Sequence, residues 1–179
     1  MSKIESLETL LHEQLKDIYS AEKQLTKALP RMAKSASSDV LKEALEAHLK
    51  ETEVQIERLE KIAEEQDIKL SGKKCRGMEG LIDEGKEALD LKGDEVLIDA
   101  AIIAAAQKVE HYEISAYGTA RTIAEQLGLS DVAELLTASL EEESAADEKL
   151  TSISEEDVLG EYLKGRSEMR ADEAPGVRG

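Results

Sequence analysis

The sequence predicts an all-α protein, built as a bundle of four long helices with a long crossover between the second and the third. Its 179 residues are dominated by Glu, Ala, Lys and Leu, with 2% aromatic residues and neither Trp nor Phe. This composition is typical of helices rather than sheets. Apolar residues make up 41% of the chain and recur at three- and four-residue steps, the spacing of a buried helix face. Their regular placement argues against disorder, although 35% of the residues are charged.

The first two predicted helices form a hairpin. The first spans residues 3–33, and the Ser- and Asp-containing cluster at 35–39 ends it and caps the second, at 40–65. The connection that follows, 66–94, is too long for a tight turn, and it contains one short helix at 78–91. A connection of this length can cross the whole bundle.

A second hairpin completes the bundle. Its first helix spans 94–126 and ends before Gly128, and its second runs from Ser130 or Asp131 to about residue 153. Hairpin, long crossover and hairpin together make the ferritin-like arrangement.

The remaining residues add a short helix and a tail. We expect one ferritin-like domain at 1–165, in which 155–164 form a short additional helix. Residues 166–179 are polar and contain Pro and Gly, and we expect them to form a disordered tail.

Polar residues interrupt the buried stripe of each long helix. In the first helix, Glu22 stands in a series of otherwise apolar residues, and Glu110 and Glu143 do the same in the third and fourth. His48 and Gln55 lie on the inward half of the second helix. A buried, unpaired carboxylate costs several kcal/mol. Each of these glutamates therefore requires a cation, a proton or a hydrogen-bond donor nearby.

The distances along the helices bring these groups to one height. Glu22 precedes the first turn by about 15 residues and Glu51 follows it by about 14, which at roughly 1.5 Å per residue is nearly the same level. In the second hairpin, Glu142 and Glu143 lie near this level after the turn, and either or both of Glu110 and Glu113 can reach it before the turn; the sequence leaves open which member of each pair points inward. The sequence therefore predicts at least four carboxylates in the middle of one core.

Clustered carboxylates repel one another and hold protons unless cations neutralise them. Glutamate-rich bundle cores are typical of di-iron and di-manganese sites, so we predict two iron ions, or manganese in their place. The alternative is an ion-pair network with Arg58, Lys108 or Arg121, or a helix rotation that leaves some glutamates in water.

Five stretches of sequence carry a resemblance to a known family. They are YSAEKQL around Glu22, HLKETEVQIERLE around Glu51, KCRGMEGLIDEG in the crossover, AAQKVEHYEISAYGTA around Glu110 and LEEESAADEKLT around Glu142. They lie across residues 4–154 and resemble the YciE/YciF family of bacterial ferritin-like stress proteins. The resemblance implies a ferritin-like bundle that forms a homodimer and is expressed under stress.

The ligand set departs from the motif that di-metal bundles carry, Glu-x-x-His on two helices. Three residues after Glu51 stands Val54, and alanines stand three residues after Glu142 and Glu143. The substitutes that we predict are His48, Gln55 and Asp147. Such a site would differ in redox behaviour from the di-metal sites that contain more histidine. Catalase or peroxidase activity therefore cannot simply be inferred for this chain from those proteins.

The net charge of −17 and the pI near 4.6 argue against nucleic acid and anionic membranes as partners. The single Cys75 has no intramolecular disulfide partner, and the sequence shows neither a signal peptide nor an apolar run of spanning length. We therefore expect a cytoplasmic protein.

We expect a ferritin-like stress-response protein whose core metals react with dioxygen or peroxide. The alternative is a non-enzymatic helical dimer that acts as a scaffold or binds a partner stress protein. Iron storage in a cage is a third hypothesis, which the dimeric state implied by the resemblance does not favour.

Overall fold

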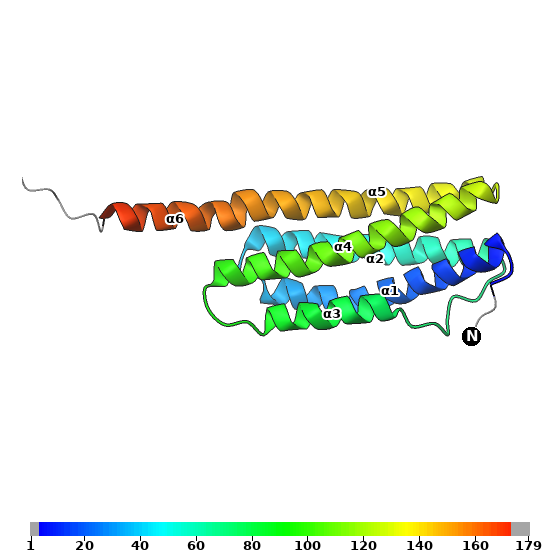
Figure 1. Ribbon diagram of the computed structural model, residues 1–179, viewed down its shortest axis with the longest axis horizontal. Coiled ribbons are helices and arrows are strands. Elements are labelled where there is room, and N and C mark those ends of the chain that lie inside the picture. The colour runs from blue at the N-terminus through cyan, green and yellow to red at the C-terminus, as the bar shows by residue number, and fades with distance from the viewer. Residues whose placement is uncertain (1–3, 173–179) are drawn as a thin grey trace, which may run out of the picture.

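The computed structural model describes residues 4–172, and they form the predicted all-α bundle (Figure 1). The four long helices are α1 (Leu7–Ser35), α2 (Asp39–Glu65), α4 (Glu95–Gln126) and α5 (Ser130–Ser152). The crossover between α2 and α4 contains α3 (Arg76–Leu89), which packs against α1 and α4. The predicted fold class is confirmed, and every predicted helix boundary in the bundle lies within about one helical turn of the observed one.

The helices begin where the sequence supplies capping side chains. The backbone N–H of Thr9 donates to Ser6 Oγ at 3.2 Å at the start of α1, and that of Leu41 donates to Ser38 Oγ at 3.3 Å at the start of α2. These bonds satisfy amides that have no partner within the helix. The turn between α4 and α5 requires Gly128, whose φ of 72° lies in the left-handed region.

A buried carboxylate that the sequence pattern does not reveal joins the two hairpins. Asp99 on α4 is 2% exposed, and its two oxygens accept hydrogen bonds from the backbone N–H groups of Ser37 and Ser38, at 2.9 and 2.7 Å. A negative charge is favourable at this point because it faces the N-terminus of α2. The contact fixes the height of the first hairpin relative to α4.

The apolar core is divided into two clusters with a polar layer between them. One cluster contains Leu25, Leu41 and Ile103, and the other contains Leu15, Leu59 and Leu136. Except for Asp99, the buried polar residues of the long helices fall at the level where the positions of one cluster give way to those of the other. Apolar packing therefore covers the polar layer at both ends.

Beyond the bundle, α5 continues as a single rod through a π-helical turn, Ile153–Val158, into α6 (Leu159–Asp172), which extends past the ends of the neighbouring helices (Figure 1). A Cβ on Gly160 would lie 2.6 Å from the carbonyl oxygen of Glu155, so the π turn requires glycine there. The predicted tail, 166–179, begins inside α6, and residues 173–179 lie outside the described part of the chain. Among residues 4–172, no helix is both long and apolar enough to traverse a bilayer.

Candidate metal centre

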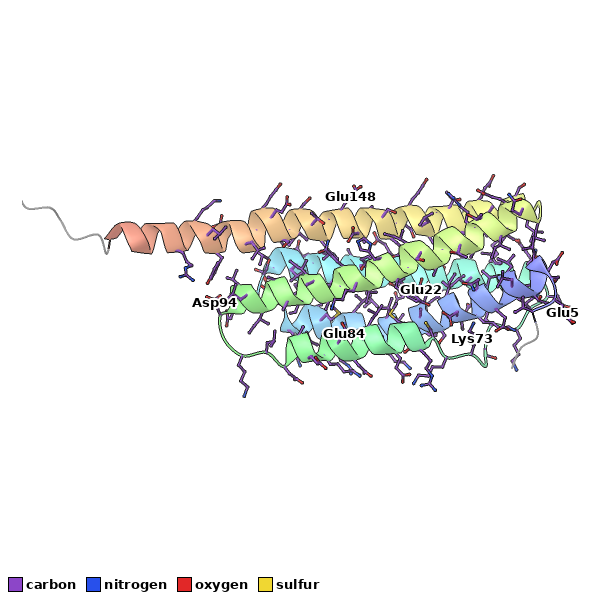
Figure 2. The ribbon with its side chains drawn as sticks, viewed as in Figure 1. Glu5, Glu22, Lys73, Glu84, Asp94 and Glu148 are labelled. Atoms are coloured by element: carbon purple, nitrogen blue, oxygen red, sulfur yellow. The ribbon has the colours of Figure 1, made fainter. Side chains whose placement is uncertain are left out.

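The polar layer gathers buried ionisable side chains from all four long helices. α1 supplies Glu22, α2 His48, α4 Glu110 and Glu113, and α5 Glu143. Each is at most 5% exposed. Figure 2 shows Glu22 within the bundle, whereas the labelled Glu84, Asp94 and Glu148 lie at its outside.

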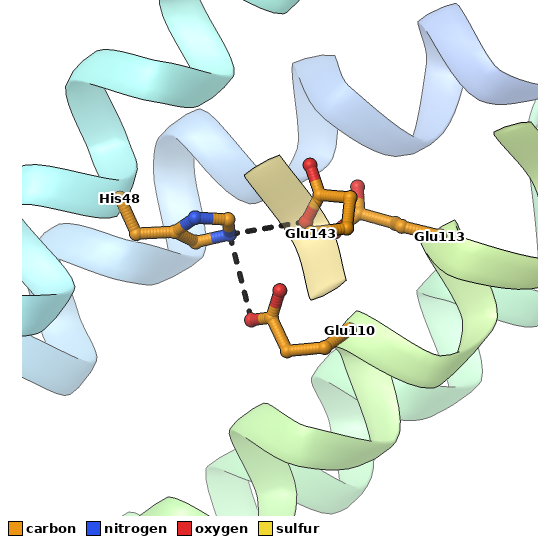
Figure 3. A group of neighbouring side chains, drawn as sticks. All are labelled: His48, Glu110, Glu113 and Glu143. Carbon is orange, nitrogen blue, oxygen red and sulfur yellow. Dashed lines mark ion pairs between the residues drawn. The ribbon is translucent and has the colours of Figure 1, made fainter. Parts of the chain in front are cut away.

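Four of these residues converge on one point. His48 Nε2 lies 3.4 Å from Glu110 Oε1 and 3.8 Å from Glu143 Oε2 (Figure 3). Together with Glu113, each of the four offers one ligand atom, and these atoms all lie within 4.8 Å of one another. This is the spacing of donor groups that can share one ion.

Glu22 occupies the adjoining part of the layer. Its Oε1 accepts a hydrogen bond of 2.5 Å from the hydroxyl of Tyr117, which is also fully buried. Burial, and after it the charge of Glu22, raise the pKa of Glu113. Tyr117 therefore fixes one oxygen of Glu22 and leaves the other directed into the layer.

Unsatisfied polar atoms are concentrated in this layer. Eight buried side-chain atoms in the described part of the chain have no hydrogen-bond partner, and seven of them belong to the layer. The seven are Glu22 Oε2, His48 Nε2, Gln55 Oε1, Glu110 Oε2, both oxygens of Glu113, and Glu143 Oε2. Because buried polar groups in proteins are nearly always paired, this concentration singles out the layer as a place that could hold a metal ion or protons.

Without cations, the layer holds protons. Burial and the charge of Glu143 raise the pKa of Glu22 to about 8. The pKa values of Glu110 and Glu113 are raised well above the usual range, chiefly by burial. Burial lowers the pKa of His48, but Glu110 and the contact with Glu51 outweigh it and raise that pKa to about 10. The metal-free layer is therefore partly protonated at neutral pH.

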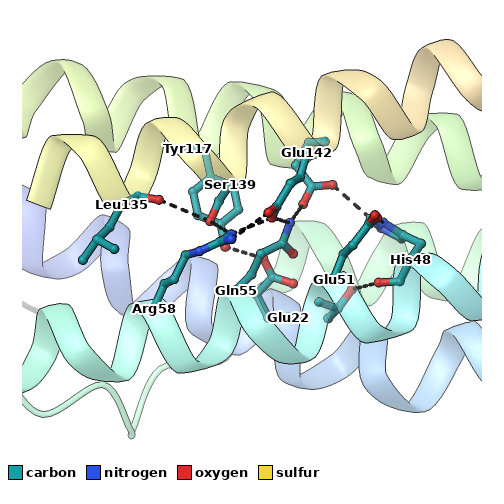
Figure 4. Close-up of polar contacts among 11 residues, drawn as sticks. Glu22, His48, Glu51, Gln55, Arg58, Tyr117, Leu135, Ser139 and Glu142 are labelled. Carbon is teal, nitrogen blue, oxygen red and sulfur yellow. Dashed lines mark hydrogen bonds and ion pairs between the residues drawn. The ribbon is translucent and has the colours of Figure 1, made fainter.

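One ion pair closes the layer on the side of α2 and α5. Both guanidinium NH groups of Arg58 donate to the carboxylate of Glu142, at 2.6 and 2.7 Å (Figure 4). Gln55 Nε2 donates to Glu142 Oε2 at 3.1 Å and to Glu143 Oε1. The other two candidate cations pair elsewhere, Lys108 with Glu84 and Arg121 with Glu125. Arginine thus neutralises Glu142, and the buried glutamates keep unpaired oxygens.

Comparison with known proteins decides the family. A family model described as "Domain of unknown function (DUF892)" matches residues 6–162. Protein YciF of Escherichia coli (strain K12) is 49% identical over 152 residues, which are 84% of this chain and 92% of that protein. The chain belongs to the YciE/YciF family.

Solved structures extend this family relationship to the fold. The crystal structure of the E. coli stress protein YciF matches with a TM-score of 0.82 at 49% identity, over 84% of this chain and 96% of that one. YcfI from Rhodopseudomonas palustris, described as a candidate structural protein, matches with a TM-score of 0.80 at 46% identity, over the same shares. A protein from Xanthomonas campestris, 21% identical with a TM-score of 0.70 over 90% of this chain and 99% of that one, shares the fold.

Of the nine site residues predicted from the sequence of this YciF-family chain, the structure brings six together. These are Glu22, His48, Gln55, Glu110, Glu113 and Glu143. Glu142 is bound by Arg58, because it lies one residue, and therefore about 100°, away from the inward position of Glu143. Asp147 lies at the edge, where Gln107 donates to it at 3.1 Å and His111 lies 3.4 Å away.

Glu51 has a different place from the one predicted. Its side chain is 47% exposed, and its Oε2 lies 3.4 Å from His48 Nδ1. A carboxylate on the second nitrogen of an imidazole orients the ring and favours the tautomer whose other nitrogen can bind a metal. Glu51 is thus a positioning residue for His48.

For Tyr117 the sequence favours core packing and leaves a hydrogen bond to the site as the second possibility, and the structure shows such a bond to Glu22. Tyrosine at a core position is compatible with simple packing, so its hydroxyl gives no signal of its own. The available signal is spacing, since Tyr117 lies two helical turns after Glu110 on the same stripe.

Proposed function

We propose that this YciF-family protein binds two divalent metal ions, iron or manganese, in its polar layer and uses them to react with dioxygen or peroxide during stress. The observation that carries the proposal is the set of seven buried atoms on four helices that have no hydrogen-bond partner. The donor set fits these metals, because carboxylate oxygens with one imidazole suit iron and manganese rather than softer ions.

The layer offers donors for two ions. His48, Glu110 and Glu143 would hold the first, and Glu22 with the amide oxygen of Gln55 would complete the second, with Glu113 available to both. Four carboxylates balance the charge of two divalent cations when His48 is neutral. Charge neutrality supports two ions rather than one.

The protein residues around the ions have separable tasks. A bound redox-active metal supplies the electrons that reduce dioxygen or peroxide. Tyr117 holds Glu22 in place through its hydroxyl, and Glu51 orients His48. The two apolar clusters keep bulk water from the ends of the layer, which strengthens every electrostatic interaction inside it.

Elemental analysis tests the proposal. Protein expressed in medium with iron and manganese and purified without chelators should carry between one and two ions of these metals per chain, removable by chelation under reducing conditions. A content of a few per cent of one ion per chain, unchanged after incubation with ferrous or manganous salts, would contradict it.

The second candidate is a helical scaffold without a working metal site, and the description of YcfI as a candidate structural protein favours it. In that case the homodimer, which the family resemblance implies, should keep its stability regardless of metal. Sedimentation of chelated and metal-loaded protein, alongside a Glu143→Gln variant, separates the two candidates. Equal stability of all three samples supports the scaffold.

A further inference from the structure

A cavity of about 150 Å³ lies between α2 and α5, beside the polar layer. His48 and Glu110 line its inner end, and each carries a buried atom that has no hydrogen-bond partner. Its outer end is lined by Glu51 and Lys149, which are exposed. The cavity therefore joins the surface of the bundle to the face of the candidate metal centre.

Hydrogen bonds join α2 and α5 along one part of their contact and are absent along the part that lines the cavity, among the described residues. Within the described part of the chain, all hydrogen bonds between α2 and α5 are made by Gln55 and Arg58, with Ser139, Glu142 and Glu143 as acceptors. One turn further along α5, and two to three turns further along α2, both helices carry small residues at this contact. The walls there include Ala44, Ala47, Ala145 and Ala146.

We propose that this cavity is the passage through which divalent cations reach the metal centre, with Ala146 setting its width. The inference rests on the proposed metal-binding function. A volume of about 150 Å³ corresponds to roughly five water molecules, so the passage has room for a cation with part of its hydration shell.

The charges at the outer end act on the approaching ion. The carboxylate of Glu51 attracts a cation and Lys149 opposes it, whereas Glu142 is already paired with Arg58. Ala146 is half-buried on the wall beside these groups, where a longer side chain would extend into the passage.

Stopped-flow uptake of Co²⁺ by the chelator-stripped full chain tests the passage, because the ligand-field absorbance of bound cobalt reports loading without any redox activity. We expect Ala146→Leu to slow uptake about tenfold and to reach the same final stoichiometry as the unmodified protein. The matched control is Ala138→Leu, on the same helix and also half-buried but outside the cavity. It should leave the rate unchanged.

A substitution that changes the charge at the outer end of the cavity tests the passage independently. Lys149→Gln removes the like charge at the outer end, so it should accelerate uptake roughly twofold at low ionic strength, with the effect lost in high salt. If Ala146→Leu fails to fold by circular dichroism, Ala47→Leu narrows the passage from the opposite wall.

Each outcome has a distinct meaning. If Ala146→Leu takes up Co²⁺ as fast as the unmodified protein, the proposal that the cavity is the passage is overturned, while the proposed metal-binding function stands. A lower final stoichiometry in that variant also overturns the passage, because it shows that the residue supports the site itself. Failure of the unmodified protein to bind cobalt at equilibrium contradicts the proposed function instead.

Discussion

Replacing Glu143 by glutamine should abolish most of the thermal stabilisation that the protein gains from metal. A ligand that binds only the folded state stabilises it by about 4 kcal/mol at a thousand times its dissociation constant. For a domain of this size, that corresponds to a rise in Tm of roughly 10 °C. Glu143 lies within the reach of His48 and Glu113, so its loss removes a charged donor from the centre of the site. Differential scanning fluorimetry with and without Mn²⁺ measures the effect.

The neighbouring residue provides the matched control. Glu142→Gln changes the same chemistry one position earlier, where the carboxylate is paired with Arg58 and partly exposed. It should keep the full metal-dependent rise in Tm and cost no more than about 1 kcal/mol of stability. If Glu142→Gln and Glu143→Gln lost the metal-dependent rise in Tm to the same extent, the structural assignment of Glu143 alone as a metal ligand would be contradicted.

The metal-free protein should lose stability as the pH rises from 5 to 8. The pKa of Glu22 is raised to about 8 by burial and the charge of Glu143, and an unfolded glutamate titrates near 4.5. Between these values the folded state holds more protons than the unfolded state, so the free energy of unfolding falls with pH. The raised pKa values of Glu110, Glu113 and His48 act in the same direction. The expected loss is on the order of several kcal/mol.

Urea denaturation of chelated protein across this pH range measures the slope. Arg58 is charged throughout the range and faces Glu142, so it does not compensate for the buried carboxyls. Glu22→Gln removes one of the titrating groups and should flatten the slope, while metal should reverse the loss at pH 8 by replacing protons in the layer. Stability that rises between pH 5 and 8 in metal-free protein would contradict the account.

Helical periodicity sufficed to predict the bundle and the level of its polar layer. Glu22 is found because it interrupts an otherwise apolar stripe, and its distance from the turn places it opposite the acidic residues of the other helices. Both deductions depend only on the rise and the repeat of an α-helix. They required no knowledge of side-chain contacts.

Periodicity was insufficient where adjacent or nearly adjacent residues compete for the inward face. Glu142 and Glu143 differ by one position, and the bidentate contact of Arg58 with Glu142 is a long-range interaction that spacing cannot reveal. The same holds for Asp99, whose partners are backbone amides more than sixty positions away along the chain. Such contacts depend on how two helices rotate against each other, which tertiary packing decides.

The most direct test is an anomalous diffraction map from crystals of protein purified without chelators, collected on both sides of the iron and manganese absorption edges. We expect metal peaks inside the bundle, one bounded by His48, Glu110 and Glu143 and a second toward Glu22. A map without such peaks, from crystals soaked in either metal and with these side chains still converged, would contradict the proposed function.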